Sequence, residues 1–168
     1  PGDACLGDAI PGGIYLLKSV SGRGFVATNN SGLYLDYEYE EEEAAQQKES
    51  LLWRISAVGN QERVYTAQSV VDERFINAGS RRDGSIHHNS NFYNKQTVEA
   101  ELDECWLHFL PIPDKNCHSI TGCLSKHHMD GRGNGMPDIL MTYRPYEKDV
   151  YLQWTLIQVR SQVKSARK

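Results

Sequence analysis

The chain has 168 residues, of which 39% are hydrophobic and 24% are charged, and its formal net charge at pH 7 is −4. This length suits a single domain and leaves little room for two. No apolar run approaches the roughly 18 residues of a membrane-spanning helix, and the acidic balance argues against binding of nucleic acid through its phosphates.

Short strands separated by turn residues are the pattern of the first third of the chain. Residues 1–13 hold four glycines and two prolines without periodicity, which predicts an irregular lead-in. Three strands are predicted next, over residues 14–20, 25–27 and 33–39. The last of them alternates apolar and charged residues, which indicates a strand with one face in water. The acidic run 40–43 is typical of a solvated loop, and a fourth strand carries Trp53.

The same order of elements recurs in the rest of the chain. The next repeat has predicted strands over 63–70 and 74–77, an arginine-bearing turn over 79–84, and a last strand around Trp106. The third has a first strand over 118–121, a second that ends at Met129 and Asp130, a third over 139–143 and a fourth that carries Trp154. The third repeat leaves no room for a crossover helix between its strands.

The spacing of the tryptophans predicts the architecture. Trp53, Trp106 and Trp154 are separated by 53 and 48 residues, and each follows a similar first-strand motif. A period near fifty residues, repeated three times, indicates three modules, over about 12–58, 62–112 and 116–159, in one domain with an exposed C-terminal tail over 160–168. Three modules of four strands predict an all-β fold, the β-trefoil with pseudo-threefold symmetry. One large ring per module is expected to fill the shared core.

The third module carries a family resemblance in its motifs. It has a strand that ends in Asp130, a G-x-G turn at Gly133 and Gly135, an aromatic at Tyr143, and Gln153 next to Trp154. In these residues the chain resembles the ricin-type β-trefoil lectin domain over about residues 12–159, although the Q-x-W motif of that family is shortened to Gln-Trp. The resemblance implies a non-catalytic protein that binds a glycan or glycoprotein.

The same module has the chemistry that sugar recognition needs. A carboxylate can accept hydrogen bonds from sugar hydroxyls, and an aromatic face can pack on the C–H side of the ring. We expect a shallow pocket in which Asp130 is the acceptor and Tyr143 the platform, with further polar groups from Arg132, Asn134 and Asp149. The alternative is that Asp130 and Gly131 form an ordinary turn in which the carboxylate caps backbone N–H groups. The other modules offer weaker counterparts, namely Asn77 and the pair Ala27-Thr28.

The four cysteines leave the redox state open. Cys117 and Cys123 are six residues apart and flank an expected hairpin turn, so a disulfide between them is one interpretation, with Cys5 then near Cys105. The alternative is four buried thiols in a reducing compartment. The compartment itself is not determined by the sequence, with secretion slightly favoured.

No metal, cofactor or catalytic motif stands out. The pairs His87-His88 and His127-His128 each consist of neighbours, and neighbours on a strand point to opposite faces, so neither pair is expected to chelate a metal. The chain lacks a G-x-S-x-G elbow, a Walker-type loop and an H-E-x-x-H motif. We therefore expect no enzyme activity and no cofactor.

A second function class is compatible with the same fold. The segment Gly13 to Leu16 and the strand with Trp154 also resemble trefoil inhibitors of proteases, of the mycocypin and Kunitz types. That resemblance implies a protease as partner and an exposed loop that carries Arg23, Arg81 or Arg82. For a lectin with one active module, a monosaccharide would bind weakly, so a homodimer or a multivalent ligand is expected to supply avidity.

Overall fold

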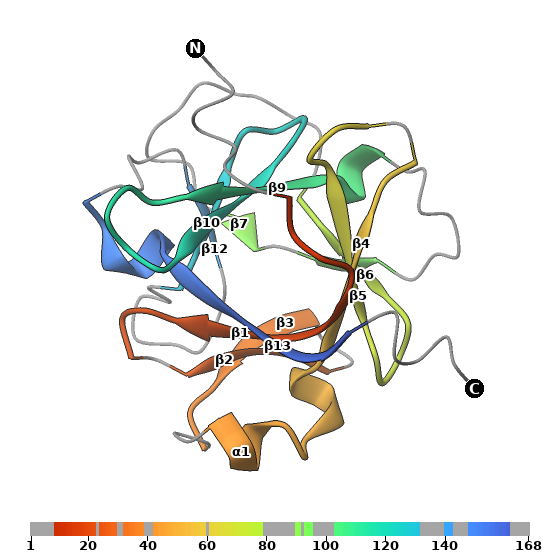
Figure 1. The fold of residues 1–168 in the computed structure, drawn as a ribbon, viewed down its shortest axis with the longest axis vertical. Coiled ribbons are helices and arrows are strands. Elements are labelled where there is room, and N and C mark those ends of the chain that lie inside the picture. The colour runs from red at the N-terminus through yellow and green to blue at the C-terminus, as the bar shows by residue number, and fades with distance from the viewer. Residues whose placement is uncertain are drawn as a thin grey trace.

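A computed structural model defines the fold over most of the chain. It describes residues 9–22, 24–29, 32–38, 42–59, 61–78, 90–91, 93–95, 103–131, 140–142 and 148–161. Nearly all regular structure in these ranges is antiparallel β-sheet (Figure 1). Within them, no helix is long and apolar enough to cross a membrane.

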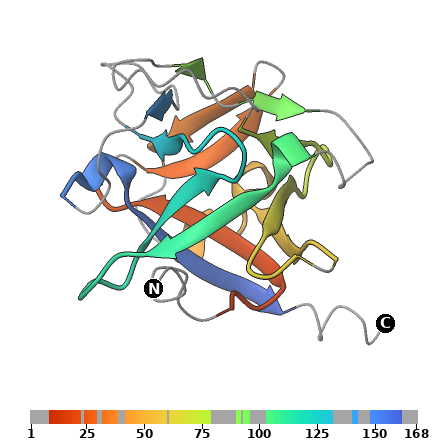
Figure 2. The ribbon, with the colours of Figure 1, turned by 90° about the horizontal axis from the view of Figure 1, so that it is seen from above.

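Six strands close into a barrel. They are β1 (Gly13–Ser19), β4 (Trp53–Ala57), β5 (Tyr65–Ser69), β9 (Leu107–Pro111), β10 (His118–Gly122) and β13 (Trp154–Ser161). Each pairs antiparallel with the next in this order, and β13 pairs with both β10 and β1, which completes the ring. Figure 2 shows β13 beside β1 and β9 beside β10.

The remaining described elements are short strands and helical turns that lie outside the six barrel strands. The short strands are β2 (Phe25–Asn29), β3 (Gly32–Asp36), β6 (Phe75–Asn77), β7 (Ser90–Asn91), β8 (Tyr93–Lys95), β11 (His128–Asp130) and β12 (Leu140–Thr142). The helical turns are α1 (Glu42–Ala45) and the 3-10 helices η2 (Glu49–Leu51), η3 (Asp103–Cys105) and η5 (Val150–Leu152). β2 pairs with β3, β6 with β8 and β11 with β12, so each module adds one hairpin to the ring.

The three modules repeat the same backbone hydrogen bonds. The turn after the first strand bonds to the residue before the last barrel strand in three equivalent places: Val70 N to Leu52 O, Cys123 N to Trp106 O, and Val20 N to Gln153 O. A six-stranded barrel with three hairpins and this repetition is a β-trefoil, and the predicted fold class is confirmed. The exact module boundaries stay a prediction.

The tryptophans do not all occupy the same position. Trp53 and Trp154 are the first residues of their strands, are fully buried, and donate from Nε1 to Val26 O at 3.0 Å and to Met129 O at 3.1 Å. In the second module the first strand residue is Leu107, which is also fully buried. Trp106 precedes it and is only half-buried. The expectation of one core tryptophan per module is therefore wrong for the second module, because Trp106 is displaced by one residue, which turns its side chain away from the core.

The chain ends are held by the barrel. Tyr15 Oη donates to Pro11 O at 2.6 Å, and Ile10 N donates to Tyr65 Oη at 2.7 Å, so residues 9–12 are irregular but tied down. At the other end, β13 continues to Ser161, which pairs with Gly13. The strand thus runs two residues into the segment predicted as a tail. Residues 1–8 and 162–168 lie outside the described ranges.

Of the two interpretations of the cysteines, the disulfide between Cys117 and Cys123 is wrong. Cys105, Cys117 and Cys123 carry reduced thiols, and Cys5 lies outside the described ranges. Cys117 and Cys123 flank β10, which agrees with the strand predicted over 118–121 and contradicts the hairpin turn expected between the two cysteines. Six residues of extended chain span roughly 20 Å, whereas a disulfide needs Cα atoms less than about 7 Å apart. Burial raises the pKa of Cys123 to about 11, so this thiol is not poised to react.

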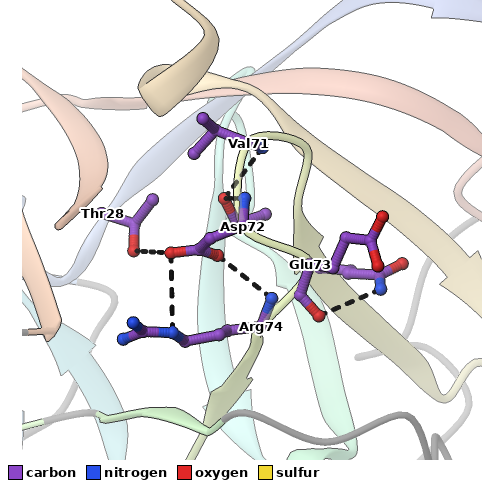
Figure 3. A network of polar contacts seen from close by, with 7 residues as sticks. Thr28, Val71, Asp72, Glu73 and Arg74 are labelled. Atoms are coloured by element: carbon purple, nitrogen blue, oxygen red, sulfur yellow. Dashed lines mark hydrogen bonds and ion pairs between the residues drawn. The ribbon is translucent and has the colours of Figure 1, made fainter. Parts of the chain in front are cut away.

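A network of polar contacts links the first two modules (Figure 3). Thr28 Oγ1, at the end of β2, donates to Asp72 Oδ2 in the turn between β5 and β6 at 3.3 Å. Arg74 lies beside the same carboxylate, with its Nε 3.7 Å from Oδ2 and its backbone N–H donating to Oδ1 at 3.1 Å. One aspartate therefore anchors both its own turn and the neighbouring module.

Candidate functional site

Asp130, the first residue predicted to bind a ligand, lies inside the molecule. It is the last residue of β11, as the sequence indicated, and it pairs with Leu140. Its side chain is turned away from the barrel core, because Met129 faces the core, yet Asp130 is only 1% exposed. In this conformation its carboxylate belongs to a buried layer and not to an open surface.

The described residues beside Asp130 in that layer are also polar. Thr121 is paired with His128 across the two strands, and Thr121 Oγ1 lies 2.8 Å from His128 Nδ1. Ser119 Oγ is 3.1 Å from the same threonine hydroxyl, and Ser119 is fully buried. The hydroxyls and the imidazole therefore satisfy one another, as buried polar groups must.

The other predicted residues fall partly outside the described ranges. Asp149 is described, and its Oδ1 accepts from Tyr151 N at 3.0 Å, which makes it the N-cap of η5. Gly131 N donates to Tyr151 O at 2.8 Å, so η5 and the end of β11 are direct neighbours. Asp149 and Asp130 thus come from adjoining elements. Arg132, Asn134 and Tyr143 lie outside the described residues.

The second and first modules replace Asp130 as the sequence comparison indicated. Equivalent hydrogen bonds, from Ala78 N to Glu104 O and from Gly131 N to Tyr151 O, place Asn77 where Asp130 stands. Asn77 is buried, and its Nδ2 donates to Glu104 Oε1 at 3.1 Å. In the first module the same place is held by Ala27, which is fully buried among apolar residues.

An open cavity lies in the first module instead. It has a volume of about 340 Å³ and is lined by the end of β3 and the loop before η2: Tyr34, Leu35, Asp36, Tyr37, Glu38 and Lys48. Tyr37 is 48% exposed, so an aromatic surface faces solvent at its rim. Asp36 is one of the lining residues although it is only 6% exposed.

Local backbone contacts hold this cavity in shape. Asp36 Oδ1 accepts from Glu38 N at 2.9 Å, which fixes the turn that leaves β3. Gly24 packs directly on that turn, with a φ of 102°, and a Cβ on Gly24 would lie 2.2 Å from Asp36 O. Only glycine allows both this approach and this conformation. The positions of Asp36 and Tyr37 thus depend on Gly24.

Charged side chains of the cavity lining lie close enough together to interact. Lys48 Nζ is 3.8 Å from Glu38 Oε1. Burial raises the pKa of Tyr34, and the nearby Asp36 carboxylate raises it further. The described lining residues therefore carry carboxylates, an ammonium group and aromatic rings, which are groups that sugar recognition uses.

Sequence reasoning missed this cavity. The segment 33–39 was interpreted only as a strand with one wet face, and the tyrosines in it were the available signal. Lys48 could not be assigned to the same place, because it reaches β3 only through the fold of α1 and η2.

No metal centre emerges in the part of the chain that the structure describes. No group of three or more His, Cys, Asp or Glu side chains is placed there to hold an ion. His127 is buried and His128 lies on β11. His87 and His88 lie outside the described residues.

Comparisons with known proteins identify the fold. No protein-family model matches the sequence, and no curated protein matches it. The Rhizoctonia solani agglutinin is similar in structure, with a TM-score of 0.62 and 13% identity over 90% of this chain and 98% of its own. A Polyporus squamosus lectin, bound to a Neu5Acα2-6Galβ1-4GlcNAc epitope, has a TM-score of 0.66 and 14% identity over 90% of this chain and 51% of its own.

One similar structure is a catalytic protein. The endo-β-galactosidase of Clostridium perfringens that releases GlcNAcα1-4Gal has a TM-score of 0.66 and 10% identity, and the match covers 87% of this chain but 32% of that enzyme. At such identities these likenesses show the fold alone. The resemblance to the trefoil lectins is thus confirmed at the level of the fold.

Proposed function

We propose that this chain is a non-catalytic, carbohydrate-binding β-trefoil and that its ligand site is the first-module cavity. The observation that carries the proposal is the cavity itself, in which the half-exposed ring of Tyr37 stands beside the buried carboxylate of Asp36. The ring supplies an apolar platform for a sugar, and the carboxylate accepts from its hydroxyls.

The third-module site remains the competing proposal. Its support is the carboxylate of Asp130 next to η5, together with the family resemblance. Both Asp36 and Asp130 are buried, at 6% and 1% exposed. The first-module site is favoured because Asp36 belongs to the lining of a cavity that also includes the half-exposed Tyr37. The two sites can be distinguished by separate substitutions.

An open site of this kind implies weak binding of a single sugar. A monosaccharide is expected to bind with a free energy on the order of 4 to 6 kcal/mol, which is a dissociation constant in the millimolar to high-micromolar range. We propose that a homodimer or a multivalent glycoprotein ligand raises the effective affinity.

The test is a glycan array with the purified protein and three variants. Tyr37→Ala should lower binding about tenfold or more, which corresponds to roughly 1.4 kcal/mol, whereas Tyr37→Phe should retain it because the ring remains. Asp130→Asn should leave binding unchanged. Loss of binding in Asp130→Asn alone would move the site to the third module, and no binding to any glycan would refute the function.

The protease-inhibitor alternative has no structural observation in its favour. Its candidate residues Arg23, Arg81 and Arg82 lie outside the described ranges. Titration against trypsin and papain, in parallel with the array, tests it directly. Stoichiometric inhibition together with a blank array would establish it in place of the lectin.

A further inference from the structure

We infer that the first-module cavity selects uncharged glycans and rejects those with a carboxylate or sulfate at the bound residue. This inference rests on the proposed function, and it follows from the charges that line the cavity. Among the described residues, the lining holds two carboxylates, of Asp36 and Glu38, against one ammonium group, of Lys48.

The Asp36 carboxylate is the strongest of these charges toward a ligand. It is 6% exposed, so little water screens it, and the one hydrogen bond described for it comes from an uncharged donor, the backbone N–H of Glu38. A charge in such a wall repels an anion more strongly than a charge on the surface does. The hydroxyls of an uncharged sugar can instead donate to it.

Lys48 of the cavity lining and Lys18 of β1 each lie close to an acidic group. Lys48 Nζ lies 3.8 Å from Glu38 Oε1, and Lys18 Nζ lies 3.8 Å from Glu42 Oε2 at the start of α1. An anionic sugar would have to compete with Glu38 for Lys48 while facing Asp36. Neither lysine therefore offsets the repulsion fully.

Glu38 is the residue through which this selectivity can be changed. Its side chain is 73% exposed, so its substitution should not disturb folding. Replacement by glutamine keeps the size of the side chain and removes the carboxylate that lies 3.8 Å from Lys48 Nζ. The charge summed over the described lining residues then changes from −1 to 0, which should weaken the repulsion of an anionic ligand.

The experiment uses matched pairs of immobilised glycans, each a neutral oligosaccharide and the same oligosaccharide with a terminal sialic acid or a sulfate. The wild-type protein should bind the neutral member about tenfold or more tightly at low salt, and this ratio should shrink as salt is added. Glu38→Gln should lower the ratio by raising affinity for the acidic member. Glu62→Gln, which removes an exposed carboxylate from the turn between β4 and β5, is the control and should leave the ratio unchanged.

Equal binding of both members by the wild-type protein would overturn the inference and leave the proposed function standing. An equal effect of Glu62→Gln would also overturn it, because the selectivity would then follow net charge and not the cavity. Absence of binding to every member of every pair would refute the proposed function and the inference with it.

Discussion

The first and third modules share a backbone but differ in the layer outside the barrel. In the first module this layer is apolar, with Leu16, Phe25 and Ala27 covered by Leu51. The equivalent positions in the third module hold Ser119, His128 and Asp130. The trefoil therefore accepts either an apolar or a polar layer, provided that each is satisfied by packing or by hydrogen bonds.

This difference shows that a module with polar side chains need not present them to a ligand. The third module attracts attention in the sequence because its carboxylate, histidine and glycines have the chemistry of a site. The structure places its carboxylate in a buried layer, while the apolar layer of the first module leaves an open cavity at its edge. A ligand site needs exposed groups, and exposure depends on what covers a strand and not on the strand itself.

The largest expected effect concerns the core that both modules share. Trp53→Ala and Trp154→Ala should each lower the free energy of unfolding by about 3 to 5 kcal/mol, because both rings are fully buried. Trp106→Ala should cost clearly less, since Trp106 is half-buried and Leu107 fills its place in the core. Urea denaturation of the three variants measures this, and equal losses would contradict the displacement of Trp106.

A second prediction compares a glycine of the first module, Gly24 in the turn before β2, with a glycine of the third, Gly131 directly after β11. Gly24→Ala should destabilise the protein by about 2 kcal/mol or more, because the new Cβ would meet Asp36 O at 2.2 Å and the residue has a φ of 102°. It should also weaken glycan binding by shifting Tyr37.

Gly131→Ala is the matched comparison. Its nearest neighbour is a ring carbon of Trp154 at 3.1 Å, so it should cost only about 1 kcal/mol. Unfolding curves and array binding of both variants are the measurements. A larger loss in Gly131→Ala would mean that the third module is the less tolerant of the two.

The third prediction tests the two outer layers directly. Leu51→Ala should cost about 2 to 3 kcal/mol, because Leu51 is fully buried in the first-module layer. Ser119→Ala should cost about 1 kcal/mol or less, because it removes one hydroxyl while Thr121 keeps its contact with His128. Chemical denaturation gives both values, and the reverse order would show that the polar layer stabilises more than the apolar one.

The smallest expected effect is a pH dependence of stability, which arises from one histidine on β9 and one on β10. Burial lowers the pKa of His118, and burial also lowers the pKa of His108 despite its hydrogen bond to Arg63 O. The folded state therefore holds these rings neutral while the unfolded chain takes up protons below about pH 6.5. The stability they contribute is present above that pH and is lost as the pH falls through it.

Denaturation at pH 7.5, 6.5 and 5.5 checks this sign. His118→Gln should show a shallower loss of stability between pH 6.5 and 5.5 than the wild-type protein. An unchanged slope in the variant would exclude His118 as a source of the acid sensitivity.

Much of the fold followed from local patterns in the sequence. Alternating apolar residues and turn residues mark strands because side chains on a strand alternate between two faces. The recurrence of strand motifs at about fifty residues then indicated three modules, and the closed barrel confirms the trefoil. The end of β11 at Asp130 and the equivalence of Asn77 with it were also predicted correctly.

Other features depended on strand register and on which segments contact each other in the folded chain. A one-residue displacement separates Trp106 from the core, and an extended β10 separates Cys117 from Cys123. Both errors come from spacing along the chain, which does not specify the face or the end of a strand. Pairing across strands settles these points.

The sequence by itself determined the fold class, because strand periodicity and turn chemistry are local properties that each module repeats. Only the tertiary structure decided which groups are accessible. Asp130 is buried by what packs around β11, whereas Asp36 and Tyr37 line a cavity with Lys48, where Gly24 packs on the end of β3. A site depends on distances between segments that are remote in sequence, and those distances arise only when the barrel closes.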